Sequence, residues 1–185
     1  MIAGTAKGAR LAPVPRGVRP VSDVAREGLF SSIAAAVPGA RVLDLYAGTG
    51  AMGIEALSRG ADSAVFVERN PAALRTIRDN LTRTHLADRA TVVASDVFGS
   101  VTGYDNGAQR FDLVLLDPPY ETVGPELDRV LGALGALGSN VLAGQGWTVV
   151  LTRARRSSTP VIPVDWLLAR RLEYGDTLVL VFRQG

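Results

Sequence analysis

Short apolar runs alternate with helical segments along most of the chain. Five of these runs are rich in β-branched residues and too short for core helices, so they are predicted to be strands. They span residues 41–46, 63–68, 90–94, 111–117 and 147–152. Apolar strands that alternate with helices are typical of a parallel sheet covered on both faces, which is an α/β fold.

Helix start and stop signals fall between these strands. Ser22 is predicted to cap a helix that ends before Pro38, and Asn70 is predicted to cap another helix after the second strand. Two further helices are expected over residues 51–59 and from about 125 to 137. From the first strand onward, strands and helices are therefore expected to alternate, as the connections of a parallel sheet require.

The chain ends in a different pattern. Residues 167–174 and 177–182 are apolar segments separated only by Gly175 and Asp176. A connection this short cannot cross over a sheet, so the two segments must pair as an antiparallel hairpin. The arrangement resembles the Rossmann-like fold of class I methyltransferases, a mostly parallel seven-stranded sheet whose last strand inserts antiparallel between the fifth and sixth. We expect residues 22–185 to form this methyltransferase domain.

The front of the chain is distinct from this core. Residues 1–21 contain three glycines and three prolines, which predicts a small β-hairpin or strand plus an extended arm appended to the domain. Residues 1–41 hold six basic and two acidic residues, a net charge of +4 against +2 for the whole chain. Charge alone leaves contact of this segment with nucleic acid and an ordinary solvated basic face equally open.

Composition excludes several classes of protein. With 185 residues, 47% of them hydrophobic and 21% charged, the chain is expected to be one globular domain. The sequence has no cysteine and one histidine, His85, which argues against disulfide scaffolds, cysteine nucleophiles and metal sites. No apolar run reaches the length of a membrane span, and the N-terminus does not resemble a signal peptide. We therefore expect a cytoplasmic, monomeric protein without a metal.

A glycine loop follows the first strand. Gly48, Gly50 and Gly53 match G-x-G-x-x-G, and Glu68 ends the second strand about where a ribose-binding acid belongs. This pattern fits nicotinamide dinucleotides as well as S-adenosylmethionine, and close packing of a helix on the sheet is the favoured explanation for Gly53. Asp44 adds D-x-x-x-G-x-G, which resembles the first motif of S-adenosylmethionine-dependent methyltransferases.

That resemblance implies a cofactor site at three strand ends. Asp44 would help hold the methionine end of S-adenosylmethionine, Glu68 would accept hydrogen bonds from both ribose hydroxyls, and Asp96 would accept one from the adenine amino group. A helix cap or a solvated turn is the alternative for each acid. The expected cofactor-binding residues are Asp44, Tyr46, Ala47, Gly48, Thr49, Gly50, Glu68, Arg69, Asp96 and Val97. S-adenosylhomocysteine would be the product.

The fourth strand ends in Asp117-Pro118-Pro119-Tyr120, the expected catalytic motif. A conjugated amine is a poor nucleophile and needs two acceptors for its hydrogens, which the Asp117 carboxylate and the Pro118 carbonyl can supply. Tyr120 offers a face on which an extruded base can stack. The motif resembles the [DNS]-P-P-[YFW] motif of methyltransferases that act on amino groups. A proline turn closed by a surface tyrosine is the alternative.

The front segment narrows the resemblance to one family. Ile2 to Gly4, Arg10-Leu11 and Arg19 to Phe30 resemble the signature of the bacterial 16S ribosomal RNA (guanine-966-N2) methyltransferases. Val21 and Val24 depart from this pattern, which usually has Thr at the first position and often Arg at the second. The resemblance implies that 16S RNA in the small ribosomal subunit is the partner.

Several arginines and one turn are candidates for contact with RNA. Arg10, Arg19 and Arg26 are the expected phosphate ligands, while Arg153, Arg155 and Arg156 either add to an RNA face or form a solvated loop. The turn at residues 174–177 is expected on the same sheet edge as the glycine loop. It either touches the substrate or serves only as a hairpin turn.

Other functions remain open at this level. A DNA adenine methyltransferase usually carries a separate recognition domain, for which the chain has no room, and a protein-glutamine methyltransferase motif normally begins with Asn rather than Asp117. A nicotinamide-dependent oxidoreductase or a non-catalytic RNA-binding module would leave part of these motifs unexplained.

Overall fold

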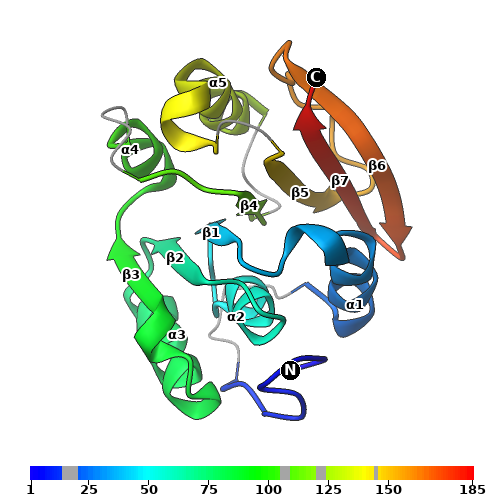
Figure 1. Ribbon diagram of the computed structural model, residues 1–185. Coiled ribbons are helices and arrows are strands. Elements are labelled where there is room, and N and C mark those ends of the chain that lie inside the picture. The colour runs from blue at the N-terminus through cyan, green and yellow to red at the C-terminus, as the bar shows by residue number, and fades with distance from the viewer. Residues whose placement is uncertain (14–20, 105–108, 120–123, 144–145) are drawn as a thin grey trace.

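The computed structural model describes residues 1–13, 21–104, 109–119, 124–143 and 146–185. Its centre is a seven-stranded sheet in the order β3-β2-β1-β4-β5-β7-β6 (Figure 1). The strands are β1 Arg41–Leu45, β2 Ser63–Glu68, β3 Ala90–Ala94, β4 Leu113–Leu116, β5 Thr148–Ala154, β6 Trp166–Tyr174 and β7 Thr177–Gln184. Strands β1 to β5 pair in parallel, and β7 pairs antiparallel with both β5 and β6. The predicted insertion of the last strand is confirmed.

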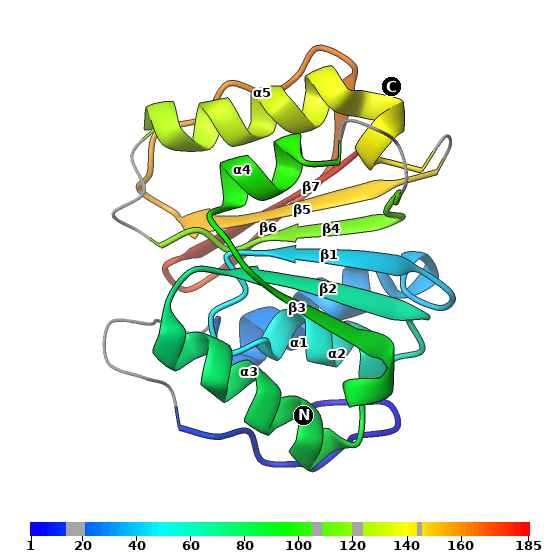
Figure 2. The same cartoon turned by 90° about the vertical axis from the view of Figure 1, so that its left-hand side faces the viewer.

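Helices cover both faces of this sheet. They are α1 Asp23–Ser32, α2 Ala51–Ser58, α3 Pro71–Thr84, α4 Val97–Thr102 and α5 Gly124–Val141. Figure 2 shows α4 and α5 on one face and α1, α2 and α3 on the other. Within the described ranges, no helix combines the length and apolar character needed to cross a membrane.

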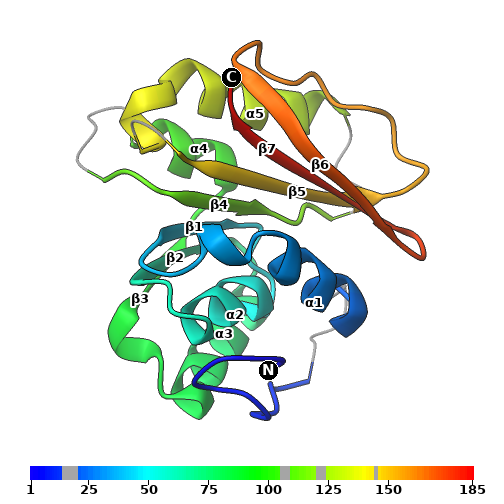
Figure 3. The ribbon, with the colours of Figure 1, turned by 45° about the vertical axis from the view of Figure 1, so that its right-hand side comes forward.

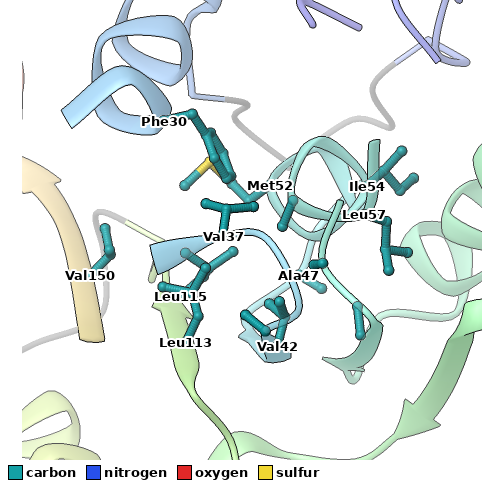
Figure 4. Close-up of a cluster of buried hydrophobic side chains, with 14 of the residues drawn as sticks. Phe30, Val37, Val42, Ala47, Met52, Ile54, Leu57, Leu113, Leu115 and Val150 are labelled. Atoms are coloured by element: carbon teal, nitrogen blue, oxygen red, sulfur yellow. The ribbon is translucent and has the colours of Figure 1, made fainter. Parts of the chain in front are cut away.

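The core consists of two apolar layers separated by the sheet. Val42 faces α1 and α2, whereas Leu43 faces α4 and α5, because successive side chains of a strand point to opposite faces. Figure 4 shows side chains of the first layer, among them Phe30 of α1, Val42 of β1 and Met52 of α2. Asp44 lies on the same face as Val42, so a carboxylate occupies the end of the row that packs against α2.

Three expectations about elements need correction. The helix after Ser22 ends at Ser32 and is followed by a short 3₁₀ turn over Ala34–Ala36, rather than continuing to Val37. Helix α4 was not expected, because its sequence VFGSVT is only six residues long and shows no apolar periodicity. Strand β5 also extends two residues beyond the expected end, which brings Arg153 into the sheet.

The described part of the N-terminal segment, residues 1–13, forms an arm that contains no strand. Residues 1–13 contain turns and extended backbone but no strand. Their hydrogen bonds go mainly to α2: Ile2 N–H and Ala3 N–H donate to Glu55, and Thr5 N–H donates to the Ser58 carbonyl. An N–H group that donates to a group on α2 is not available for the hydrogen bonds of a strand pair. These hydrogen bonds fix the arm to the surface of the domain.

Glu55 anchors this arm from inside the protein. Its side chain is fully buried, with Oε1 2.8 Å from Nε of Arg59 and Oε2 3.9 Å from Nε of Arg26. The same two oxygens accept the two N–H groups of the arm at 3.0 and 3.1 Å. One buried carboxylate therefore joins the arm, α1 and α2.

We expect Glu55→Ala to lower the free energy of unfolding by about 3–5 kcal/mol, because it leaves buried partners of a charge without their counterion. Glu27→Ala, at an exposed acid on α1, is the matched control and should change it by less than about 0.5 kcal/mol. Urea denaturation measures both values. Equal midpoints for the two variants would contradict the anchoring role of Glu55.

Candidate active site

A cleft of about 1100 Å³ lies at the carboxyl ends of the parallel strands. This is the edge of the sheet at which α5 begins in Figure 2, and it is where open α/β sheets bind ligands. Nine of the ten expected cofactor-binding residues line this cleft: Asp44, Tyr46, Ala47, Gly48, Thr49, Glu68, Arg69, Asp96 and Val97. Gly50 is not among the lining residues. Asp117, Pro118 and Pro119 line the same cleft. Tyr120 and Arg19 lie outside the described residues.

Asp44 places a buried carboxylate at the floor of the cleft. Its Oδ2 accepts the N–H of Gly53 at 2.9 Å, and within the described chain its Oδ1 has no hydrogen-bond partner. Burial raises the pKa of Asp44 well above its usual range, the Gly53 N–H opposes that rise, and the negative charges of Asp117 and Glu68 add to it. A buried acceptor without a partner is costly, so this oxygen fits a cationic or hydrogen-bonding group of a ligand.

Gly53 is needed for packing, as expected from its position in α2. A methyl group at this position would lie 2.4 Å from Cε1 of Phe66 and 2.9 Å from Oδ2 of Asp44. Both distances are below ordinary contact distances, so only glycine lets α2 approach β1 and β2 this closely. The third glycine of the motif therefore sets the distance between the helix and the sheet.

Glu68 holds the glycine loop against the end of β2. Its Oε2 accepts the N–H of Gly48 at 2.9 Å, and its Oε1 accepts those of Arg69 and Asn70 at 2.8 Å each. A carboxylate offers about four acceptor positions, so three are used and about one remains. Hydrogen bonds to two ribose hydroxyls would require one of the three backbone bonds to be exchanged.

Asp96 caps α4. Its Oδ1 accepts the N–H of Gly99 at 2.8 Å, which is the helix-cap role considered as an alternative. The residue also lines the cleft. Capping one helix uses one oxygen and leaves acceptor capacity that faces the cleft.

Asp117 is fixed by a partner that the sequence analysis did not identify. Oγ1 of Thr152, a buried residue of β5, donates a hydrogen bond to Oδ1 of Asp117. Burial raises the pKa of Asp117 to about 6, and the Thr152 hydrogen bond opposes that rise. The sequence did show a polar residue, Thr152, at the end of the apolar run 147–152. It could not show that Asp117 is the partner of Thr152, because that contact depends on β5 lying next to β4.

Tyr46 and the start of α5 complete the wall of the cleft. Tyr46 has φ +60°, and among the described residues its hydroxyl has no hydrogen-bond partner. Burial raises the pKa of this hydroxyl to about 12, with a further contribution from Glu126. Arg129 of α5 lies over the Phe98 ring, 4.3 Å from its centroid, and so links α5 to α4 beside the cleft.

The structure corrects the role expected for Arg26. Its side chain is buried, with Nη2 2.8 Å from Oδ1 of Asp23 and Nε facing Glu55, so it is committed inside the protein instead of exposed to phosphate. Arg10 is exposed on the arm. Of the two departures from the family signature, Val21 lines the cleft and Val24 is exposed.

The turn between β6 and β7 lies beside α1 (Figure 3). Tyr174 packs so closely on α1 that a methyl group at Gly28 would lie 2.0 Å from the tyrosine hydroxyl. Thr177, at the other end of the turn, lines the cleft, so the turn is on the expected edge of the sheet. Its contact with α1 shows that it also has a structural role.

Comparisons with known proteins agree with this architecture. Residues 1–183 match the family model described as "Conserved hypothetical protein 95". The chain is 30% identical to "Putative rRNA methyltransferase YlbH" of Bacillus subtilis, over 100% of this chain and 98% of that protein. It is 30% identical to "Ribosomal RNA small subunit methyltransferase D" of Escherichia coli K12, over 100% and 89%. The solved structure "Putative methyltransferase yhhF from Escherichia coli" superposes with a TM-score of 0.83 at 31% identity, covering 100% of this chain and 96% of that chain.

The sheet order and the cleft define a class I methyltransferase, the class that uses S-adenosylmethionine as cofactor. Within that class, the chain belongs to the bacterial 16S ribosomal RNA methyltransferase family. The family predicted from the sequence is thereby confirmed.

The packing of Gly53 leads to a test with an internal control. Gly53→Ala should destabilise the protein by about 1–3 kcal/mol, because the added methyl group overpacks the contact of α2 with the sheet. Gly132→Ala, in the interior of α5, meets no atom within 4 Å and should stabilise it by about 0.5–1 kcal/mol through helix propensity. Thermal or urea unfolding distinguishes the two signs, and stabilisation by both substitutions would show that α2 has room to move.

Proposed function

We propose that this protein transfers a methyl group from S-adenosylmethionine to the exocyclic N2 amine of a guanine in the 16S RNA of the small ribosomal subunit, at the position that its family calls guanine-966. The observation that carries the proposal is the shared cleft, in which the Asp117-Pro118-Pro119 motif faces the glycine loop, Asp44 and Glu68. The names of the relatives support ribosomal RNA as the substrate.

The residues of the cleft fit the proposed cofactor. S-adenosylmethionine supplies an electrophilic methyl group on a positively charged sulfur. The unpartnered Oδ1 of Asp44 suits the cationic methionine end, and the remaining acceptor position of Glu68 suits a ribose hydroxyl. Asp96 would accept from the adenine amino group with the oxygen that does not cap α4. Arg69 and Val97 would line the nucleoside end of the site.

Asp117 and Pro118 would orient the target amine. The lone pair of the guanine N2 amine is delocalised into the ring, and acceptors aimed at its two hydrogens turn that lone pair toward the methyl group. Ionised Asp117 provides one acceptor, and the Pro118 carbonyl provides the other. Because the methyl donor is already reactive, positioning and electrostatics can provide most of the rate enhancement. Tyr120 would stack on the extruded base, and Arg10 and Arg19 would contact RNA phosphates.

Single-turnover methylation of small subunits that lack the mark tests the proposal. We expect mass spectrometry of the digested RNA to find N2-methylguanosine at one position. Asp117→Ala should slow the transfer at least about a hundredfold with cofactor binding little changed, because it removes the acceptor that orients the amine. Asp88→Ala, at an exposed acid outside the cleft, serves as the control. A methyl group on another atom, or a normal rate for Asp117→Ala, would refute the proposal.

The pKa of Asp117 predicts a pH dependence. Since an ionised carboxylate accepts a stronger hydrogen bond from the amine than a protonated carboxyl group does, the transfer rate should rise through pH about 6 and level off above it. Thr152→Val keeps the shape of the side chain but removes the hydrogen bond that lowers this pKa, so the midpoint should move to higher pH. Thr152→Ser should retain the wild-type midpoint. An identical midpoint for all three proteins would show that Asp117 does not control the rate.

A further inference from the structure

A second cavity, of about 290 Å³, lies beyond the catalytic cleft. Its outer wall is the connection between β5 and β6, which runs beside α5 (Figures 1 and 3). This connection is held in place, since Val161 N–H donates to Oδ1 of Asp128 at 2.8 Å and Pro163 packs on Gly135. The cavity is therefore built by defined contacts on the same side of the sheet as α5.

The lining of this cavity is mainly apolar, with hydroxyl groups at one part of it. Trp166, Leu178 and Phe182 supply apolar side chains from β6 and β7, and the lining also includes Arg171 of β6. The connection supplies the apolar Pro160 and Ile162 and the hydroxyl groups of residues 157–159. The volume is at the small end of the roughly 300–1,000 Å³ typical of ligand pockets, so it suits one nucleobase or nucleoside better than a whole dinucleotide. An aromatic and aliphatic wall facing hydroxyl donors is suited to a flat base attached to polar groups.

Arg153 joins the second cavity to the catalytic cleft. It lines both, although its side chain is only 8% exposed. Within the described residues its Nη1 has no hydrogen-bond acceptor, and burial lowers its pKa from the usual value while Asp128 opposes that change. A buried charged donor without a partner is costly, and a ligand anion would remove that cost.

Arg153 is also adjacent in sequence to the residue that fixes Asp117. It follows Thr152, whose hydroxyl group binds the Asp117 carboxylate. Since Arg153 lines both the cleft and the second cavity, a ligand that occupies both would lie beside this residue. Such a ligand needs a flat group at each end and an anion between them, which is the covalent order of base, phosphate and base in a polynucleotide.

We propose that Arg153 binds the RNA phosphate beside the target guanine and that the second cavity receives the base of the neighbouring nucleotide. This inference rests on the proposed function, because it takes the target base to be at Asp117. Arginine is suited to this position because its planar fork binds phosphate with two hydrogen bonds. The subsite would select the nucleotide context of the target without contacting the cofactor.

The test compares two matched arginine substitutions. Arg153→Met removes the charge but retains the apolar stem, and replacing a buried charge in this way is often neutral for stability. Arg183→Met makes the same change at an exposed arginine of β7 that pairs with Thr148, at the opposite end of β5. Ser158→Trp fills the second cavity from an exposed position without changing charge. Thermal unfolding checks that all three variants are folded.

For Arg153→Met we expect KM for unmethylated small subunits to rise about tenfold or more, as for the loss of a hydrogen bond to a charged group. The salt slope of binding should fall by about one unit. Ser158→Trp should raise KM with an unchanged slope, and Arg183→Met should behave as wild type. Calorimetry should show unchanged S-adenosylmethionine affinity in all three.

The outcomes separate this inference from the proposed function. If the wild type methylates subunits and Arg153→Met matches Arg183→Met, the inference is overturned and the function stands. If Ser158→Trp retains the wild-type KM, the base does not enter the second cavity and the inference is likewise overturned. If the wild type modifies no subunit, the proposed function fails. Anisotropy with a short guanine-containing single-stranded RNA then tests the phosphate contact alone: weaker binding by Arg153→Met than by Arg183→Met would support that contact, and equal binding would overturn it.

Discussion

The hydrogen bond from the Gly53 N–H to the Asp44 carboxylate ties the central strand to the helix that follows the glycine loop. It requires a glycine at position 53, because any side chain there would collide with Phe66 or with the carboxylate itself. With α2 held at this distance, the loop between β1 and α2 has little freedom. Its Gly48 N–H is then bound by Glu68 at the end of the neighbouring strand. The shape of the cofactor side of the cleft follows from these two contacts.

The buried charged side chains of this protein differ in how many partners they have. Glu55 is fully buried but has two arginines and two backbone N–H groups as partners, so its charge is compensated and stabilises the position of the arm. Asp44 and Arg153 each keep an atom without a partner in the described part of the chain, and both line the catalytic cleft. The compensated charge of Glu55 therefore supports the architecture, whereas the unpartnered atoms of Asp44 and Arg153 lie where a ligand can bind. Nε of Arg26 also has no hydrogen-bond partner among the described residues, but it faces Glu55 at 3.9 Å.

In the cleft, the proposed cofactor-binding acids and the proposed catalytic motif come from different halves of the sheet. The proposed cofactor acids lie at the ends of β1 and β2 or follow β3, while Asp117 follows β4 and is oriented by Thr152 of β5. The two groups meet because β1 and β4 are neighbours at the centre of the sheet, although they are far apart in sequence. Beyond β5 the antiparallel strands β7 and β6 supply the apolar wall of the second cavity. The catalytic motif thus lies between the proposed cofactor side and the proposed RNA side.

The sequence by itself determined the strands, most of the helices, the final hairpin and the residues at the strand ends. These features depend on local signals: apolar runs, helix caps and a two-residue turn are all read within a short window. The tertiary structure decided the rest. Residues 1–13 form no strand, because N–H groups of this part of the arm bind Glu55 and Ser58, more than 50 residues away. Arg26 is buried because Glu55 of α2 lies opposite it, and Thr152 binds Asp117 because β5 packs against β4. Each of these contacts joins segments whose proximity is set by strand order, and no local pattern in the chain records which distant residue will supply the partner.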